Sequence, residues 1–243
     1  MTVGLSLACC TQKLPEEITS DVSPEKIMEF GNQAFNKKYY NQAGDYYLEL
    51  NRLYPYSSLD SKALLRAVES FYRAEKYEKT RFAADKFLIT YSNSLEAEKV
   101  FYLKAFSYCN QILAVDRDQS EAKSCIVSLK RFRSIYPSSK NTKKVTKQIK
   151  EAQEFLVGQE LTIGKYYLKR KNPSAAIRRF KEVRKTVKYS KFIPEISYRL
   201  IEGYLMLGLV NEAIEEEKKM KKAFPNNSWT SEATQLLGKF RSV

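Results

Sequence analysis

Apolar residues recur at helical spacing along most of the chain, in pairs of stretches separated by short polar turns. The first pair lies between Ser23 and Ser57. Ser23 can cap a helix, and Pro24 can occupy the first helical position, where a missing N–H costs nothing. Tyr54 precedes Pro55, which disfavours helix at the residue before it, so the second stretch ends there. The pattern predicts two amphipathic helices in a hairpin of about 34 residues, the period of a tetratricopeptide repeat.

Small residues at fixed places in this hairpin support the repeat. Gly31, Ala43 and Tyr47 precede Pro55 at the spacing at which tetratricopeptide repeats carry glycine, alanine and an aromatic residue. A large side chain at either small residue would push the two helices apart. We therefore expect Gly31 and Ala43 to face each other where the helices approach most closely.

Four more hairpins are expected from about residues 59, 95, 142 and 192. The fourth repeats the small and aromatic residues of the first with Gly164, Tyr167, Ala176 and Phe180. Its long first helix is expected to bury one stripe of residues, which are Ile149, Ala152, Phe155, Leu156, Ile163 and Tyr167.

A last amphipathic helix, about Ser228 to Phe240, is expected to cover the exposed face of the fifth hairpin. Its apolar face consists of Trp229, Ala233, Leu236, Leu237 and Phe240. The sequence therefore predicts an all-α protein. It would be an α-solenoid of five tetratricopeptide-like helical hairpins with a C-terminal capping helix, wound as a right-handed superhelix.

A charged insertion interrupts the third hairpin. Asp116, Arg117 and Asp118 follow one another there, and the segment is too charged for a core. Such an insertion either fixes the helix ends by Asp–Arg pairing or contacts a partner. Cys109 and Cys125 lie on the two helices of this hairpin, and both a disulfide and ordinary buried thiols are compatible with the sequence.

The composition excludes several classes of function. The chain has 243 residues, a formal net charge of +14 and no histidine, so histidine-based triads and zinc sites are absent. It has no Gly-rich nucleotide motif and no CxxC. We therefore predict no catalytic residue, no metal site and no cofactor.

Basic residues are concentrated in one stretch. Between Lys165 and Lys191 stand eleven lysines and arginines with one acid, Glu182. The stretch lacks the aromatic or glycine pattern of an RNA- or DNA-binding module, so nucleic acid is not the expected partner. A solvated face and a docking face for an acidic protein surface both fit this charge.

The N-terminus looks like the end of a bacterial lipoprotein signal peptide. The uncharged run from Met1 to Ala8 ends in a small residue before Cys9, and Cys10 follows. Cys9 is the expected site of cleavage and acylation, and Cys10 is the alternative. The run is short and lacks a basic start, so an apolar tip with two incidental cysteines is the competing interpretation.

Five hairpins, an interrupted third hairpin and a possible acylated cysteine together resemble the BamD family, also called ComL or YfiO. These are lipoproteins of the bacterial outer-membrane β-barrel assembly machinery, and the resemblance covers Pro24 to Leu237. The motifs that carry it are Leu53-Tyr54-Pro55-Tyr56, Val115 to Gln119, Phe132 to Ser139, and Val157 to Phe180.

The resemblance implies a non-enzymatic, lipid-anchored protein on the periplasmic face of the outer membrane. Residues 1–22 would be signal remnant and tether. Residues 23–94 would receive targeting segments of unfolded β-barrel proteins, with Tyr54, Pro55 and Tyr56 in the substrate site. Residues 95–243 would hold the POTRA domains of BamA, and other Bam lipoproteins would also bind. The partner-binding residues implied are Arg179, Arg178, Asp116, Arg117 and Asp118.

Two alternatives remain at this point. Tyr54 and Tyr56 could be ordinary hairpin packing, since an aromatic residue precedes proline again at Tyr136 and Phe224. The whole chain could also be a soluble tetratricopeptide adaptor that binds a protein or chaperone tail.

Overall fold

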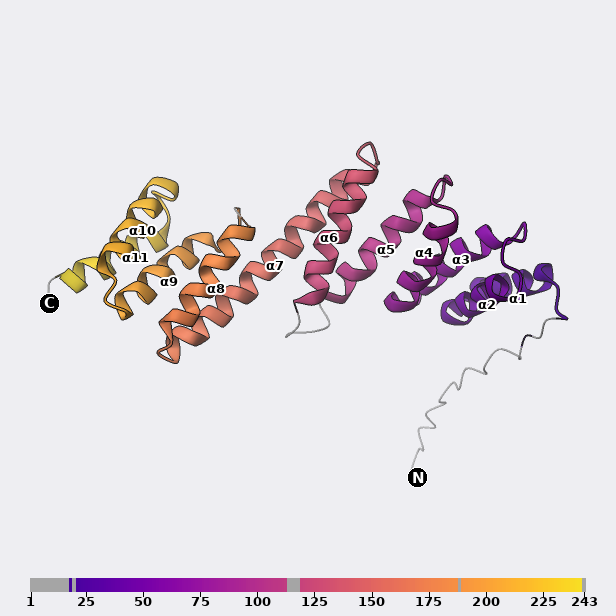
Figure 1. Ribbon diagram of the computed structural model, residues 1–243, viewed down its shortest axis with the longest axis horizontal. Coiled ribbons are helices and arrows are strands. Elements are labelled where there is room, and N and C mark those ends of the chain that lie inside the picture. Colours follow the sequence, from indigo (N-terminus) through magenta and orange to yellow (C-terminus); the bar gives the residue numbers. More distant parts are fainter. Residues whose placement is uncertain (1–17, 19–20, 113–118, 188, 242–243) are drawn as a thin grey trace, which may run out of the picture. The chain divides into compact units, whose positions relative to one another are not determined.

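The computed structural model describes residues 18, 21–112, 119–187 and 189–241. These residues form eleven helices and no strand, so the all-α prediction is confirmed for them (Figure 1). Cys9 and Cys10 lie outside the described residues, as do Asp116, Arg117 and Asp118.

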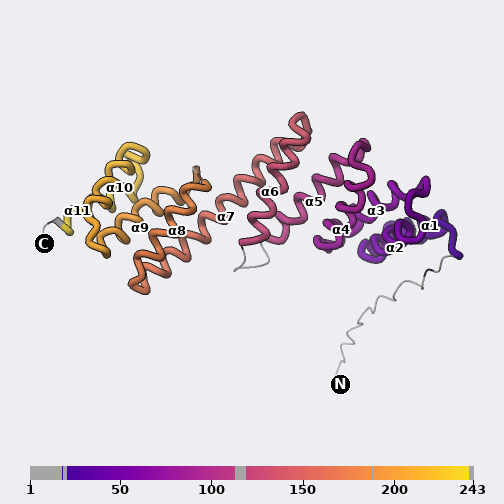
Figure 2. Tube along the Cα trace, viewed as in Figure 1, coloured from indigo at the N-terminus to yellow at the C-terminus, as the bar shows by residue number. Residues whose placement is uncertain are grey.

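The chain divides into two compact units. The first consists of Met1–Ala114 with Ser134–Pro137, and the second of Val115–Arg133 with Ser138–Val243. The tube in Figure 2 follows the helices along the chain within each unit. The assignment of substrate and docking roles to residues on either side of position 94 stays a prediction.

In the first unit each helix packs on the next one in the chain, as expected for successive hairpins. Ser23 accepts a hydrogen bond from the Lys26 N–H at 3.3 Å, so the predicted cap is present. The core is continuous from Ile27 to Val100. The helices are α1 (Pro24–Asn36), α2 (Tyr40–Leu53), α3 (Asp60–Arg73), α4 (Tyr77–Thr90) and α5 (Ala97–Gln111).

The close approach of α1 and α2 differs in one detail from the expectation. A Cβ atom on Gly31 would lie 2.4 Å from the Tyr47 ring, and its three nearest atoms all belong to Tyr47. Gly31 therefore leaves room for the aromatic ring, where Ala43 was expected to be its closest neighbour. Ala43 is itself fully buried.

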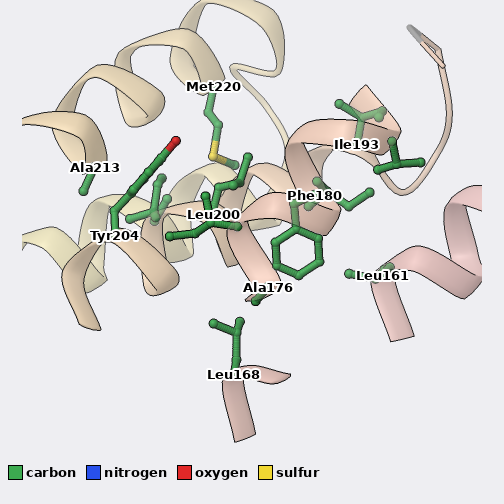
Figure 3. Close-up of a cluster of buried hydrophobic side chains, with 14 of the residues drawn as sticks. Leu161, Leu168, Ala176, Phe180, Ile193, Leu200, Tyr204, Ala213 and Met220 are labelled. Carbon is green, nitrogen blue, oxygen red and sulfur yellow. The ribbon is translucent and has the colours of Figure 1, made fainter. Parts of the chain in front are cut away.

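The second unit has a separate core, around Phe180 and Leu200 (Figure 3). Gly164 and Phe180 repeat the packing of the first hairpin, because a Cβ on Gly164 would lie 2.1 Å from that ring. The helices that follow α5 are α6 (Ser120–Ile135), α7 (Thr142–Lys169), α8 (Pro173–Thr186), α9 (Ile193–Met206), α10 (Val210–Ala223) and α11 (Ser228–Arg241).

The buried stripe of α7 was predicted only in part. Ile149 and Ala152 are buried, but four other residues of the expected stripe are only partly buried. The buried α7 residues beside the core of the second unit are Val157, Leu161, Gly164 and Leu168, and Tyr167 of the expected stripe packs against that core while partly buried. This long helix carries apolar residues on neighbouring faces, and the packing of α8 and α9 selects one of them.

Helix α11 packs on both α9 and α10, which confirms the predicted cap. Ala233 and Leu237 are buried, and the Trp229 ring lies 5.2 Å from that of Tyr198. Phe240 was expected on this buried face, but it is 45% exposed. The prediction for Phe240 is wrong because the buried residues of α11 end at Leu237.

Cys109 and Cys125 are each disulfide-bonded, so neither is an ordinary buried thiol. Within the described ranges, no helix has the length and apolar character needed to cross a membrane. No group of three or more potential metal ligands occurs there either.

Candidate functional site

The predicted substrate residues form the turn between α2 and α3. Tyr54 is half-buried, and its hydroxyl donates a hydrogen bond to the Val22 carbonyl at 2.8 Å. Pro55 is exposed, and Tyr56 is 80% exposed. The turn therefore separates two roles: Tyr54 holds the chain that leads into α1, and Tyr56 presents its ring to solvent.

The backbone of Tyr56 has an unusual conformation. Its φ is +67°, in the left-handed region that glycine tolerates and a bulky residue rarely adopts. Such a conformation costs about 1–2 kcal/mol and needs support from its surroundings. The support comes from Asp60, whose carboxylate accepts a hydrogen bond from the Tyr56 N–H at 3.2 Å.

Asp60 is the organising residue of this turn. It is only 1% exposed, and it accepts two further hydrogen bonds at 2.8 Å, from the Asn51 amide and the Tyr91 hydroxyl. These donors satisfy a buried carboxylate that would otherwise be costly to desolvate. Since Tyr91 follows α4, one side chain connects the turn of the first hairpin to the end of the second.

The same arrangement affects Tyr91. Burial, followed by the hydrogen bond to the negatively charged Asp60, raises the pKa of Tyr91 to about 12. The phenol is therefore protonated at neutral pH and acts as a donor. The Asp60–Tyr91 bond keeps its direction over the physiological range.

The second unit contains the predicted partner-binding arginines. Arg179 on α8 pairs with Glu160 on α7 at 3.3 Å. Gln119, which directly follows the charged insertion, donates to the same carboxylate at 2.8 Å. The structure thus brings Arg179 and the end of the insertion motif to one residue, Glu160, which the sequence reasoning did not identify.

Arg178 differs from its neighbour. It is exposed, and within the described part of the chain no carboxylate pairs with it. Its guanidinium remains available for bidentate contact with an acidic surface. Arg179 is already engaged, so Arg178 is the better candidate for direct contact with a partner.

Two open cavities adjoin α7 in the same unit. One, of about 520 Å³, is lined by Phe155, Gly158 and Phe192; the other, of about 770 Å³, is lined by Tyr189 and Ile193, among other residues. Their charged rim includes Lys165, Lys191 and Glu154.

A family model and the related proteins found by sequence comparison point to the same family. A family model described as "YfiO: Outer membrane lipoprotein" matches residues 20–220. The chain is 31% identical over 237 residues to "Outer membrane protein assembly factor BamD" of Caulobacter vibrioides, covering 97% of this chain and 78% of that protein. The protein of that name from Rickettsia prowazekii is 29% identical over 243 residues, covering 100% and 96%.

Among solved structures, the TPR2AB domain of yeast Sti1, in its pHSP90 complex, is similar over 90% of this chain and 86% of that chain. The identity is 14% and the TM-score 0.42.

Proposed function

The chain belongs to the YfiO family of outer membrane lipoproteins, and from this premise we propose that it is an assembly factor for outer membrane proteins. Factors of this family are non-enzymatic, so the chain acts by binding other polypeptides. It belongs to a Bam complex, in which its specific contacts are with the POTRA domains of BamA and with other Bam lipoproteins.

The observation that carries the client-binding role is the Tyr56 turn. A ring that is 80% exposed gains little from folding, and its left-handed backbone costs stability. The buried Asp60 nevertheless holds it in place. This combination supports a preformed contact for an extended, aromatic-rich segment of an unfolded β-barrel protein, with ring-to-ring packing on Tyr56.

The docking role rests on the basic surface of α8. Arg178 is exposed and has no acidic partner among the described residues, and Arg179 lies beside it with Glu160. Arg178 would form a bidentate pair with a carboxylate of a BamA POTRA domain. Asp116, Arg117 and Asp118, which lie outside the described residues, are expected to contact the same partner, and Gln119, which follows them, donates to Glu160.

Acylation of Cys9, or of Cys10, would hold the protein on the periplasmic face of the outer membrane. The segment that leads from this anchor is attached to the first unit. Ile18 and Val22 pack on its core, and Tyr54 donates to the Val22 carbonyl. The segment that follows the anchor would therefore reach the proposed client turn, because Val22 accepts the hydrogen bond from Tyr54.

The test measures binding of two partners to purified protein. For the client, a labelled peptide from the last strand of an outer membrane β-barrel protein is titrated. We expect Tyr56→Ala to weaken binding about tenfold, since burying an aromatic side chain is worth about 1.5–3 kcal/mol. Tyr39→Ala, which removes another exposed ring of the same unit, serves as the control.

For BamA, the soluble POTRA domains are used. Arg178→Glu should abolish co-purification, whereas Lys169→Glu, an equal charge change at an exposed position of α7, should not. Equal effects of each variant and its control would contradict the assigned sites, and no binding of either partner by the wild type would contradict the function.

A further inference from the structure

The first unit contains a charge cluster that neither proposed site uses. It lies where α5 packs on α3, and Phe35 at the end of α1 lies beside Arg66 of α3. Among the described residues, Glu69 on α3 is the one acidic residue of this cluster. Its carboxylate accepts hydrogen bonds from two cationic side chains. Arg66 donates to it at 3.3 Å, and the Lys99 ammonium from α5 pairs with it as well. The members of this central cluster are Phe35, Tyr40, Arg66, Glu69, Arg73 and Lys99.

Glu69 and its two cationic partners differ in how far their side chains are exposed to solvent. The Glu69 side chain is 14% exposed, whereas those of Arg66 and Lys99 are 37% and 58% exposed. The acid therefore lies deep, and the two cations remain open to solvent above it. A ligand carboxylate can reach both cations without entering the core.

Aromatic rings orient the arginines. The guanidinium groups of Arg66 and Arg73 lie 4.9 Å and 5.0 Å from the centroid of the Phe35 ring. Arg73 also lies 5.6 Å from Tyr40, whose ring contacts Phe35 edge-on. A guanidinium stacked by its face keeps its edge donors free for a carboxylate.

The charges do not balance. Arg73 is exposed and has no carboxylate partner within the described ranges, so three cations accompany one acid. Oriented donors with a surplus of positive charge favour an anion with two oxygens, because paired N–H donors match the geometry of a carboxylate. The ligand that this arrangement fits is a peptide carboxylate.

We propose that the central cluster is a carboxylate receptor for client polypeptides, and that Glu69 occupies it as an internal competitor when no client is bound. The inference rests on the proposed client-binding function and adds a second contact to the Tyr56 turn. A client carboxylate would replace Glu69 as the partner of Arg66 and Lys99 and would pair with Arg73. This exchange of ion-pair partners is non-covalent.

The direction in which Glu69→Gln changes the affinity for the client distinguishes this role from a structural one. If Glu69 only joins α3 to α5, Glu69→Gln weakens the fold and leaves or lowers client binding. If Glu69 competes with the client, the same substitution tightens binding. A control with the same charge change is available on α2, where Glu49 pairs with the exposed Arg52 at 2.5 Å and with no other cation among the described residues.

The experiment titrates a fluorescein-labelled peptide of alternating polar and apolar residues that ends in phenylalanine. The peptide is made as the free acid, as the C-terminal amide, and as an amide with one internal aspartate. With the free acid we expect Glu69→Gln to tighten binding about threefold, and Arg66→Gln or Arg73→Gln to weaken it about threefold, the scale of one exposed ion pair. Glu49→Gln should change nothing, and thermal unfolding of each variant reports on folding.

The peptide forms identify the source of the carboxylate. If the substitutions change the affinity of the free-acid peptide alone, the receptor takes a chain terminus. If they change the affinity of the aspartate peptide equally, the receptor takes any carboxylate. Equal affinity of acid and amide for the wild type, or tightening by Glu49→Gln as large as by Glu69→Gln, would overturn the proposal. If no peptide form binds the wild type while folding is intact, the client-binding function itself fails.

Discussion

Aromatic rings packed over glycines set the distance between paired helices at the residue scale. Tyr47 covers Gly31 in the first unit, and Phe180 covers Gly164 in the second. Both rings are completely buried. Gly44 plays the same part between consecutive hairpins, because a Cβ there would lie 2.5 Å from the Phe71 ring. Each glycine is thus required by packing, although helix propensity alone would favour alanine.

Gly164→Ala is therefore expected to destabilise the protein. The added methyl would meet Phe180 at 2.1 Å, and such overpacking costs about 1–3 kcal/mol of the free energy of unfolding. Gly238→Ala in α11 is the matched control, since nothing lies within 4 Å of its Cβ. There the higher helix propensity of alanine should add up to about 1 kcal/mol. Urea unfolding measures both, and a stabilised Gly164→Ala would contradict the packing argument.

Hairpins are joined at the element scale by a buried polar contact as well as by apolar packing. Asp60 begins α3 and bonds to Asn51 at the end of α2 and to Tyr91 after α4. In a repeat protein such contacts between neighbours contribute a large share of stability. Asp60 also fixes the Tyr56 backbone, so the client turn and the packing of the first two hairpins depend on one residue.

A double-mutant cycle tests this coupling. Asp60→Ala removes the acceptor of three hydrogen bonds, from Asn51, Tyr56 and Tyr91, and should cost about 1–3 kcal/mol. Tyr91→Phe removes one of these donors, so the two effects should be non-additive by about 1 kcal/mol. Asp45→Ala, which breaks the Lys79 pair at 2.8 Å and the Asn41 hydrogen bond at 3.3 Å, should be additive with Tyr91→Phe. Urea denaturation gives all the values, and additivity of the Asp60 pair would exclude the coupling.

For the molecule as a whole, we expect attachment to the membrane to depend on the N-terminus. No helix in the described ranges is long and apolar enough to span a bilayer. The family consists of outer membrane lipoproteins. We expect acylation of Cys9 to anchor the chain as in other lipoproteins, and one acyl chain alone binds membranes only weakly, whereas several hold firmly.

We expect Cys9→Ala to release the protein from the outer membrane. The variant is expressed in a bacterium with an outer membrane, and its membrane and soluble fractions are compared with those of the wild type. Mass spectrometry of the mature wild-type N-terminus should show an acylated cysteine. Cys10→Ala is the control and should remain membrane-bound. Release by Cys10→Ala alone would assign the lipid to Cys10, and an unprocessed Met1 in the wild type would contradict anchoring altogether.

The sequence by itself determined the local elements. Ser23 and Pro24 mark a helix start, and the aromatic residue before Pro55 marks an end, because capping and proline sterics act over a few residues. Helical periodicity of apolar residues likewise identifies each hairpin. The turn of Tyr54 to Tyr56 and the arginines Arg178 and Arg179 were proposed as site residues through family resemblance, and their roles stay predictions.

Only the tertiary structure decided which groups meet across elements. It selected Val157 and Leu161 over Ile163 as the buried face of α7, and it left Phe240 exposed. It also brought Asp60 to Tyr91 and Glu69 to Lys99, pairs about thirty residues apart. A carboxylate's partners are set by whichever helix packs beside it, and no local pattern in the sequence encodes that choice.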